Sequence, residues 1–249
     1  MISVIVPVYN AKNYICETME MVRGQSHEDW ELLLIDDASL DESVKLIEGY
    51  LKKQKDPRIR LIKKENNEGA AAARNRGIKE AKGRYIAFLD ADDIWRKDKL
   101  EKQLAFMEKH QSSFVFTSYE FGDEKAVGTG KIVHVPKKLT YEQALSRTVI
   151  FTSTVLLDTT RIKKELIYMP LVPSEDSATW WQILRNGHVA EGMDVVTAIY
   201  RRPEQSLSSN KLKAMQRIWF LYRKVEKINI LKSCCLFIGW ALRATARRI

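Results

Sequence analysis

The stretch YIAFLDADDIW, residues 85–95, joins a run of apolar residues directly to three carboxylates. Asp90, Asp92 and Asp93 lie within four positions, and no basic residue separates them. Like charges packed this closely repel, and each raises the cost of ionising its neighbours. A buried strand that ends in this way is expected to hold something positive at its tip.

Short apolar runs like this one alternate with helical patterns through the first half of the chain. The patterns predict strands at residues 3–8, 31–35, 58–63 and 85–89. They predict helices that begin after Asn10, at Ser39 or Asp41, at residue 70 and at residue 97. Continuous apolar strands between helices indicate an α/β fold, with a Rossmann-like, mostly parallel central sheet flanked by helices.

Polar residues follow each predicted strand at the same end. They are Tyr9-Asn10, Asp36-Asp37, Asn66-Asn67 and the acidic run from Asp90. In open α/β sheets, ligands bind beyond the carboxyl ends of the strands. This edge of the sheet is therefore the predicted binding site.

The second half of the chain is less regular. Strands are expected at residues 114–119, 131–135, 153–157 and 195–201, and a helix is expected at 175–185. From residue 211 the pattern is helical to the C-terminus, with a break near Asn229. We expect a catalytic domain at residues 1–210 and a separate amphipathic helical segment at 211–249.

The composition is that of an ordinary globular protein, with 45% hydrophobic and 29% charged residues in 249. Cys16, Cys234 and Cys235 show no zinc-binding spacing, which favours a reduced, cytosolic setting. The opening residues MISVIVPVYN lack a basic region and a cleavage site, so no signal peptide is expected. No apolar stretch approaches the roughly 18 residues needed to span a bilayer.

The net charge of +9 is concentrated in one segment. Residues 211–249 hold ten Lys and Arg against one acid, Glu226, whereas the other 210 residues hold 31 basic and 31 acidic side chains. Basic, aromatic helices too short to span a membrane are typical of interfacial anchors, so we expect an anionic membrane surface as a partner. The alternatives are packing on the catalytic domain or self-association as a homo-oligomer. Nucleic-acid binding is not expected, because no recognised module accompanies the charge.

The D-x-D at residues 90–92 supplies only oxygen ligands, which suit Mg²⁺ or Mn²⁺. Mg²⁺ usually takes one or two protein carboxylates and completes its shell with water and phosphates, so the pattern indicates a metal–diphosphate substrate. The chain has no GxxxxGK[ST] or GxGxxG motif, so isolated basic groups such as Arg74 are expected at the phosphates. The alternative is that Asp92 and Asp93 cap the next helix.

Four motifs, ISVIVPVYN, LLLIDDASLDES, NNEGAAAARNRG and GRYIAFLDADDIW, resemble the family 2 glycosyltransferases in order and spacing. SEDSATWWQIL and YRRPEQSLSSNK further resemble bacterial enzymes of capsular, teichuronic or related surface-polysaccharide synthesis. The resemblance implies the A-type glycosyltransferase fold and a nucleotide-sugar donor, with UDP favoured. It implies transfer of a hexosyl or N-acetylhexosaminyl group to a glycan or lipid-linked acceptor, at the inner face of the bacterial plasma membrane.

The resemblance also implies roles for individual residues. The nucleotide pocket would be lined by Pro7, Tyr9, Asn10, Asp37, Asn67, Gly69 and Arg74. Asp37 would bind the base, and Asp90 and Asp92 would form the metal-binding pair, with Asp92 the more direct ligand. Two alternatives remain: Arg74 as a solvated surface residue, and Gly69 as a simple helix opener.

Sugar transfer by a single displacement inverts configuration and needs a base that is separate from the D-x-D. Asp176, at the start of the helix expected at 175–185, is the predicted base, and Glu175 would orient it or contact the acceptor. Trp180 and Trp181 are expected to stack on sugar rings or, alternatively, to lie in the core. The alternative is that Ser174 caps this helix, with both acids merely complementing its dipole. Two other functions are considered: a sugar-phosphate nucleotidyltransferase and a non-catalytic nucleotide-sugar or glycan-binding module.

Overall fold

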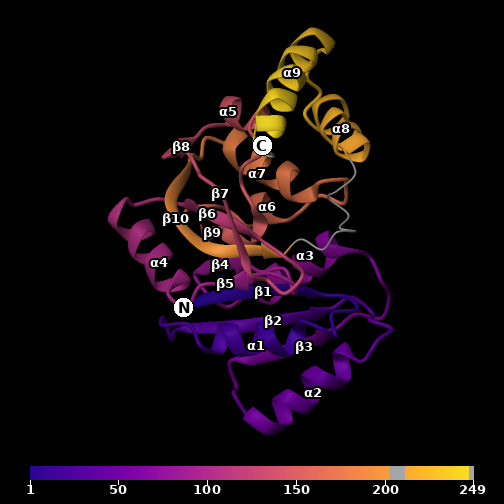
Figure 1. Cartoon of the computed structure of the whole chain (residues 1–249), viewed down its shortest axis with the longest axis vertical. Coiled ribbons are helices and arrows are strands. Elements are labelled where there is room, and N and C mark those ends of the chain that lie inside the picture. Colours follow the sequence, from indigo (N-terminus) through magenta and orange to yellow (C-terminus); the bar gives the residue numbers. More distant parts are fainter. Residues whose placement is uncertain (202–210, 247–249) are drawn as a thin grey trace.

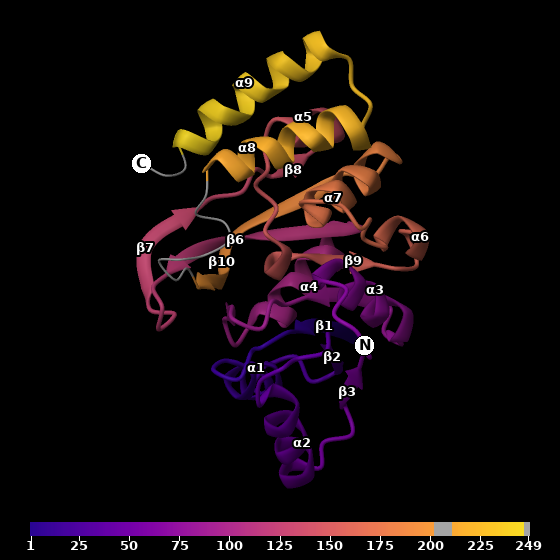
Figure 2. The same cartoon turned by 90° about the vertical axis from the view of Figure 1, so that its right-hand side faces the viewer.

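The computed structural model describes residues 1–201 and 211–246 (Figure 1). Its centre is a ten-stranded sheet in which eight strands follow the order β3-β2-β1-β4-β9-β6-β10-β5, while β7 pairs with β6 and β8 pairs with β10. Helices α1 and α2 lie at one end of the molecule, and the C-terminal helices α8 and α9 lie at the other (Figures 1 and 2). The α/β class predicted from the sequence is confirmed.

The first four strands form the parallel part of the sheet. They are β1 (Ile2–Val8), β2 (Trp30–Asp36), β3 (Ile59–Lys63) and β4 (Tyr85–Phe88). β1 pairs in parallel with β2 on one side and β4 on the other. Every residue of β2 and β4 is buried, so helices cover both faces of the sheet here. This is why these strands are continuous apolar runs rather than alternating ones.

The connecting helices of this half are α1 (Ile15–Arg23), α2 (Ser43–Gln54), α3 (Ala70–Glu80) and α4 (Lys99–Lys109). All four were predicted, but the first begins later than expected. Asn10 has a φ of 51° and is not the N-cap of α1. Its side-chain oxygen instead accepts a hydrogen bond of 2.9 Å from the backbone N–H of Leu40, which joins the loops after β1 and β2.

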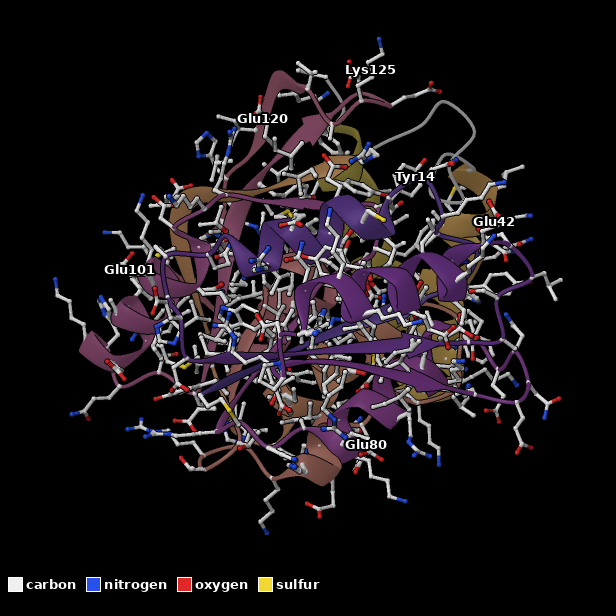
Figure 3. The ribbon with its side chains drawn as sticks, turned by 90° about the horizontal axis from the view of Figure 1, so that it is seen from below. Tyr14, Glu42, Glu80, Glu101, Glu120 and Lys125 are labelled. Atoms are coloured by element: carbon white, nitrogen blue, oxygen red, sulfur yellow. The ribbon has the colours of Figure 1, made fainter. Side chains whose placement is uncertain are left out.

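The second half of the sheet departs from the parallel pattern. Its strands are β5 (Ile94–Trp95), β6 (Phe114–Gly122), β7 (Gly128–Val133), β8 (Lys138–Leu139), β9 (Leu156–Asp158) and β10 (Ala190–Arg201). β9 runs antiparallel to both β4 and β6, whereas β10 runs parallel to β6. The strand expected at residues 153–157 begins instead as a 3₁₀ turn, Thr152–Thr154. The hairpin of β6 and β7, which carries Glu120 and Lys125, projects at the edge of the molecule in Figure 3.

Three short or medium helices complete this half: α5 (Tyr141–Leu145), α6 (Lys164–Ile167) and α7 (Glu175–Arg185). The C-terminal segment forms α8 (Lys211–Phe220), a π-helical turn (Leu221–Val225) and α9 (Ile230–Ala246). The expected break near Asn229 thus falls between the π turn and α9. No helix in the described part of the chain is long and apolar enough to cross a membrane.

The C-terminal segment packs on α5 and α7 rather than standing apart from them. The rings of Tyr222 and Trp181 stack with centroids 5.6 Å apart and planes at 2°. The Tyr222 hydroxyl donates a 2.5 Å hydrogen bond to the carbonyl of Leu145. Glu226, which is 1% exposed, accepts hydrogen bonds from Tyr141 and Arg185 at 2.5 and 2.7 Å. One face of the segment is therefore built into the core.

Candidate active site

A cavity of about 430 Å³ opens at the carboxyl ends of β1, β2 and β4. It gathers the residues that follow these strands with the start of α3, as the strand order requires. Nine of the residues expected at a nucleotide and metal site line it, namely Pro7, Tyr9, Asn10, Asp37, Asn67, Gly69, Arg74, Asp90 and Asp92. Residues from four separate stretches of sequence thus meet in one hollow.

Arg74 links this cavity to the start of α7. Its guanidinium is buried and donates to Asp90 Oδ1 at 2.5 Å and to Glu175 Oε1 at 3.0 Å. Burial opposes the charge, but the neighbouring carboxylates outweigh it and raise the pKa of Arg74 above its usual range. The alternative interpretation of Arg74 as a solvated surface residue is therefore wrong.

Asp37 organises the loop between β3 and α3. Its buried carboxylate accepts hydrogen bonds from the backbone N–H of Gly69 at 2.7 Å and of Glu68 at 3.2 Å, and from Lys64 Nζ at 2.5 Å. Gly69 has a φ of 88°, a conformation that favours glycine because it has no Cβ. Asn67 closes the same loop by donating to the carbonyl of Asp37 at 3.2 Å.

The acidic run after β4 is held by one serine. Ser153 Oγ accepts the N–H of Asp90 at 3.1 Å and donates to Asp93 Oδ2 at 2.5 Å. Burial, followed by the charge of Asp90, raises the pKa of Asp92. The same causes, together with Asp92, raise the pKa of Asp93 well above its ordinary value. Neither Asp92 nor Asp93 caps the next helix, because α4 begins after Asp98.

These side chains fit a hard divalent cation. Asp93 Oδ1 is buried and has no hydrogen-bond partner among the described residues, and burial, followed by the neighbouring negative charges, raises the pKa values of Asp92 and Asp93. No group of three or more His, Cys, Asp or Glu side chains in residues 1–201 and 211–246 could hold a metal by itself. The carboxylates of Asp90 and Asp92 therefore suit an ion that takes its other ligands from water and substrate phosphates.

Arg201, the last residue of β10, fixes the backbone of the acidic run. It donates to the carbonyl of Asp92 at 2.7 Å and to Glu17 Oε2 at 2.6 Å, and its guanidinium lies 4.7 Å from the ring centre of Tyr14. Figure 3 labels Tyr14, which also lines the cavity. The role of Arg201 at Asp92 carries no sequence signal, because 109 residues separate the two.

Asp176 lies in the first turn of α7, next to the Glu175 that pairs with Arg74. Its carboxylate accepts the N–H of Ser177 at 2.6 Å and a long hydrogen bond of 3.4 Å from Thr152 Oγ1. Burial, then the charge of Glu175, raises the pKa of Asp176. Ser174 occupies the N-cap position of α7 with a φ of 57°, but its side chain makes no capping hydrogen bond, so the expected capping by its hydroxyl is wrong.

Trp180 and Trp181 do not offer ring faces to a sugar. They are 1% and 2% exposed. Trp180 packs against Phe88 and Phe114 with ring centroids 6.0 and 5.5 Å away, and Trp181 stacks on Tyr222. Asp176 lies in the first turn of the helix, whereas both tryptophans sit further along on its inward face, where burial of their large apolar rings is favourable. The expectation of sugar stacking is wrong, and the core alternative holds.

The fold and the site define an α/β protein with a ligand cavity at the carboxyl ends of parallel strands and an acidic strand tip beside it. Residues 3–156 match the model of glycosyl transferase family 2. The chain belongs to this family, and it has the A-type glycosyltransferase fold. It is thus a glycosyltransferase that resembles enzymes of surface-polysaccharide synthesis.

Two curated relatives align over most of the chain. TuaG of Bacillus subtilis, named as a teichuronic acid biosynthesis glycosyltransferase, is 42% identical over 250 residues that span 100% of this chain and 98% of that protein. WfgD of Escherichia coli, a UDP-Glc:α-D-GlcNAc-diphosphoundecaprenol β-1,3-glucosyltransferase, is 38% identical over 88% of this chain and 84% of its own.

Two solved structures share the fold at low sequence identity. Staphylococcus aureus TarS 1-349 in complex with UDP-GlcNAc superposes with a TM-score of 0.70 at 21% identity, over 96% of this chain and 71% of TarS. The mannosyltransferase PcManGT of Pyrobaculum calidifontis, in complex with GDP-Man and Mn²⁺, gives a TM-score of 0.75 at 18% identity, over 98% and 73%.

Proposed function

We propose that this chain is a metal-dependent, inverting glycosyltransferase that moves a sugar from a UDP-sugar to a hydroxyl of a lipid-linked glycan during synthesis of a bacterial surface polysaccharide. The observation that carries the proposal is the meeting of the nucleotide-type cavity, the acidic tip of β4 and the start of α7 at Arg74. The similarity to WfgD, which acts on a diphosphoundecaprenol-linked sugar, supports the acceptor class.

In this proposal the donor lies in the cavity with its base near Asp37 and Asn67. Asp37 is already bonded to Lys64 and to two backbone N–H groups, so it holds the loop that shapes the base pocket as well as lining it. The diphosphate then reaches Asp90 and Asp92. A Mg²⁺ or Mn²⁺ ion held there would stabilise the negative charge of the departing diphosphate electrostatically.

Asp176 takes the proton from the acceptor hydroxyl as the hydroxyl attacks the sugar. A base works best when its pKa lies near the working pH, and burial beside Glu175 moves the pKa of Asp176 in that direction. Arg74 fixes Glu175, and therefore the first turn of α7, relative to the acidic tip of β4.

Binding of UDP-sugars to the purified protein tests the donor assignment. Calorimetric titration with a panel of UDP-sugars should show saturable binding in Mn²⁺ or Mg²⁺ and at least tenfold weaker binding in EDTA. Asp92→Ala should lose the metal-dependent part, whereas Asp98→Ala, an exposed aspartate at the start of α4, should bind as the wild type does. Equal affinity in metal and in chelator would refute the metal assignment.

We further propose that the enzyme works in the cytoplasm, at the inner face of the plasma membrane, where a lipid-linked acceptor is presented. The support is the charge of the C-terminal segment, ten basic residues against one acid. The surface that would make this contact is a separate question.

A further inference from the structure

Helix α9 has two apolar faces, and only one of them is packed. On the inner face, Phe237 contacts Trp219 and Trp240 with ring centroids 5.8 and 5.6 Å apart. Trp240 Nε1 donates to Thr148 Oγ1 at 3.0 Å, and Arg243 donates to Ser146 Oγ at 3.0 Å. This face therefore fastens the helix to the loop after α5.

The outer face of α9 is an exposed apolar stripe. Its members are Leu231, the adjacent pair Cys234 and Cys235, Ile238 and Leu242, so the stripe recurs every three or four residues. Leu231, Ile238 and Leu242 are 78%, 60% and 68% exposed. Such spacing places side chains on one side of a helix, here over about 16 Å of its length. Figure 2 shows α9 as the outermost element at its end of the molecule.

The exposed charges that the C-terminal segment itself places around the stripe have one sign, and one neighbouring acid, Glu142 of α5, pairs with Lys232 at 3.3 Å. Lys232 and Arg243 lie within the helix and are exposed, and Lys224 and Lys227 precede it and are also exposed. The single acid of residues 211–249 is Glu226, and it is withdrawn from the surface into its bonds with Tyr141 and Arg185. The exposed charge of this segment is therefore entirely positive.

This positive charge distinguishes two candidate partners of the stripe, a second copy of the chain and an anionic bilayer. A second copy of the chain would bring two basic segments together, which like-charge repulsion disfavours. An anionic bilayer offers acyl chains to the apolar residues and negative phosphates to the lysines and arginines, as interfacial helices require. Since α9 cannot span a membrane, it would lie in the plane of the interface.

We propose that the outer stripe of α9 inserts into the interface of an anionic phospholipid bilayer. The inner face of the same segment, through Tyr222 and Glu226, packs against α7, the helix that carries Asp176 in its first turn. The bilayer contact and the candidate base thus lie on elements that pack against each other. The role of this docking in catalysis rests on the proposed transfer to a lipid-linked acceptor. The binding of α9 to lipid does not depend on that proposed function.

Vesicle flotation of the full-length protein tests the claim directly. The wild type should float with vesicles that contain 30% phosphatidylglycerol, remain unbound with pure phosphatidylcholine, and lose most of its binding in 0.5 M NaCl. Ile238→Asp combined with Leu242→Asp should reduce partitioning at least tenfold. Val127→Asp, an exposed apolar residue in the β6–β7 turn, is the matched control and should float as the wild type does.

Two further measurements separate the possible failures. Turnover of a short-chain, water-soluble acceptor analogue should be the same in the stripe variant and the wild type. Wild-type protein that floats with the vesicles but does not turn over this analogue would count against the proposed function and not against docking. Wild-type protein that stays unbound to anionic vesicles at low salt overturns the docking proposal. The proposal is also overturned if sedimentation shows that the wild type is a dimer that does not bind vesicles, and that the stripe variant is a monomer.

Discussion

The donor cavity and the base-bearing helix are built in different ways. Around the cavity, polar residues follow directly from strand ends, and hydrogen bonds between neighbouring loops at this edge of the sheet hold them, as between Asp37 and the N–H of Gly69. Asp176 instead lies in the first turn of α7, a helix that is held by packing against the C-terminal segment, through Trp181 on Tyr222 and Arg185 on Glu226. The donor side thus depends on where the parallel strands end, whereas the acceptor side depends on tertiary contacts with the C-terminal segment. Arg74 is the one described side chain that bonds to both.

The largest expected effect comes from the acceptor side. Asp176→Asn keeps the shape of the side chain but removes its ability to accept a proton, so we expect kcat to fall about 10³-fold, within the usual range for a general base. The affinity for the UDP-sugar should stay within twofold, because the donor side is untouched. Steady-state kinetics and calorimetry on the same preparation measure both quantities, and turnover close to that of the wild type would remove Asp176 as the base.

The second effect is on the link between the two sides. Arg74→Met leaves the carboxylates of Asp90 and Glu175 without their buried cation, and breaking a buried pair in this way costs about 3 kcal/mol. Urea unfolding should show this loss. The control is Arg76→Met, two residues further along α3. Arg76 is exposed and paired with Glu80, so its loss should cost less than about 1 kcal/mol. Equal losses in the two variants would mean that Arg74 is no more than a surface residue.

The difference between the two sides explains which parts of the site could be predicted from the sequence. The strands at the donor side are continuous apolar runs, and the residues after them had to meet because parallel strands share one carboxyl edge. The sequence cannot show that Arg201 bonds to the carbonyl of Asp92, or that Ser153 bridges Asp90 and Asp93, since these contacts cross the sheet. The helical pattern of α7 was clear, but which of its faces was buried depended on the C-terminal segment, so Trp180 and Trp181 were misplaced.

A smaller effect is expected at the contact between α7 and the C-terminal segment. Glu226→Gln removes the charge that pairs with Arg185 in a buried position, and we expect a loss of about 2 kcal/mol in unfolding free energy, as for hydrogen bonds to charged groups. The affinity for the UDP-sugar should not change, because Glu226 touches only the acceptor side. Glu142→Gln, an exposed residue of α5 paired with Lys232, is the control and should be nearly neutral. A matching loss of donor affinity in Glu226→Gln would show that the two sides are less separate than described.

The smallest effect is a shift along the pH axis. Burial and then the negative charge of Glu175 raise the pKa of Asp176, the Ser177 N–H and Arg74 lower it, and Asp90 raises it. Since a base acts only when deprotonated, kcat should fall as the pH drops through this raised pKa. Glu175→Gln removes the repelling charge and keeps an oxygen for Arg74, so the acid limb of the kcat profile should move to lower pH. Glu165→Gln, exposed on α6, should leave the limb unchanged. A limb that stays in place or moves to higher pH in Glu175→Gln would mean that Asp176 is not the group that titrates, because every other charge facing it is the same in both proteins.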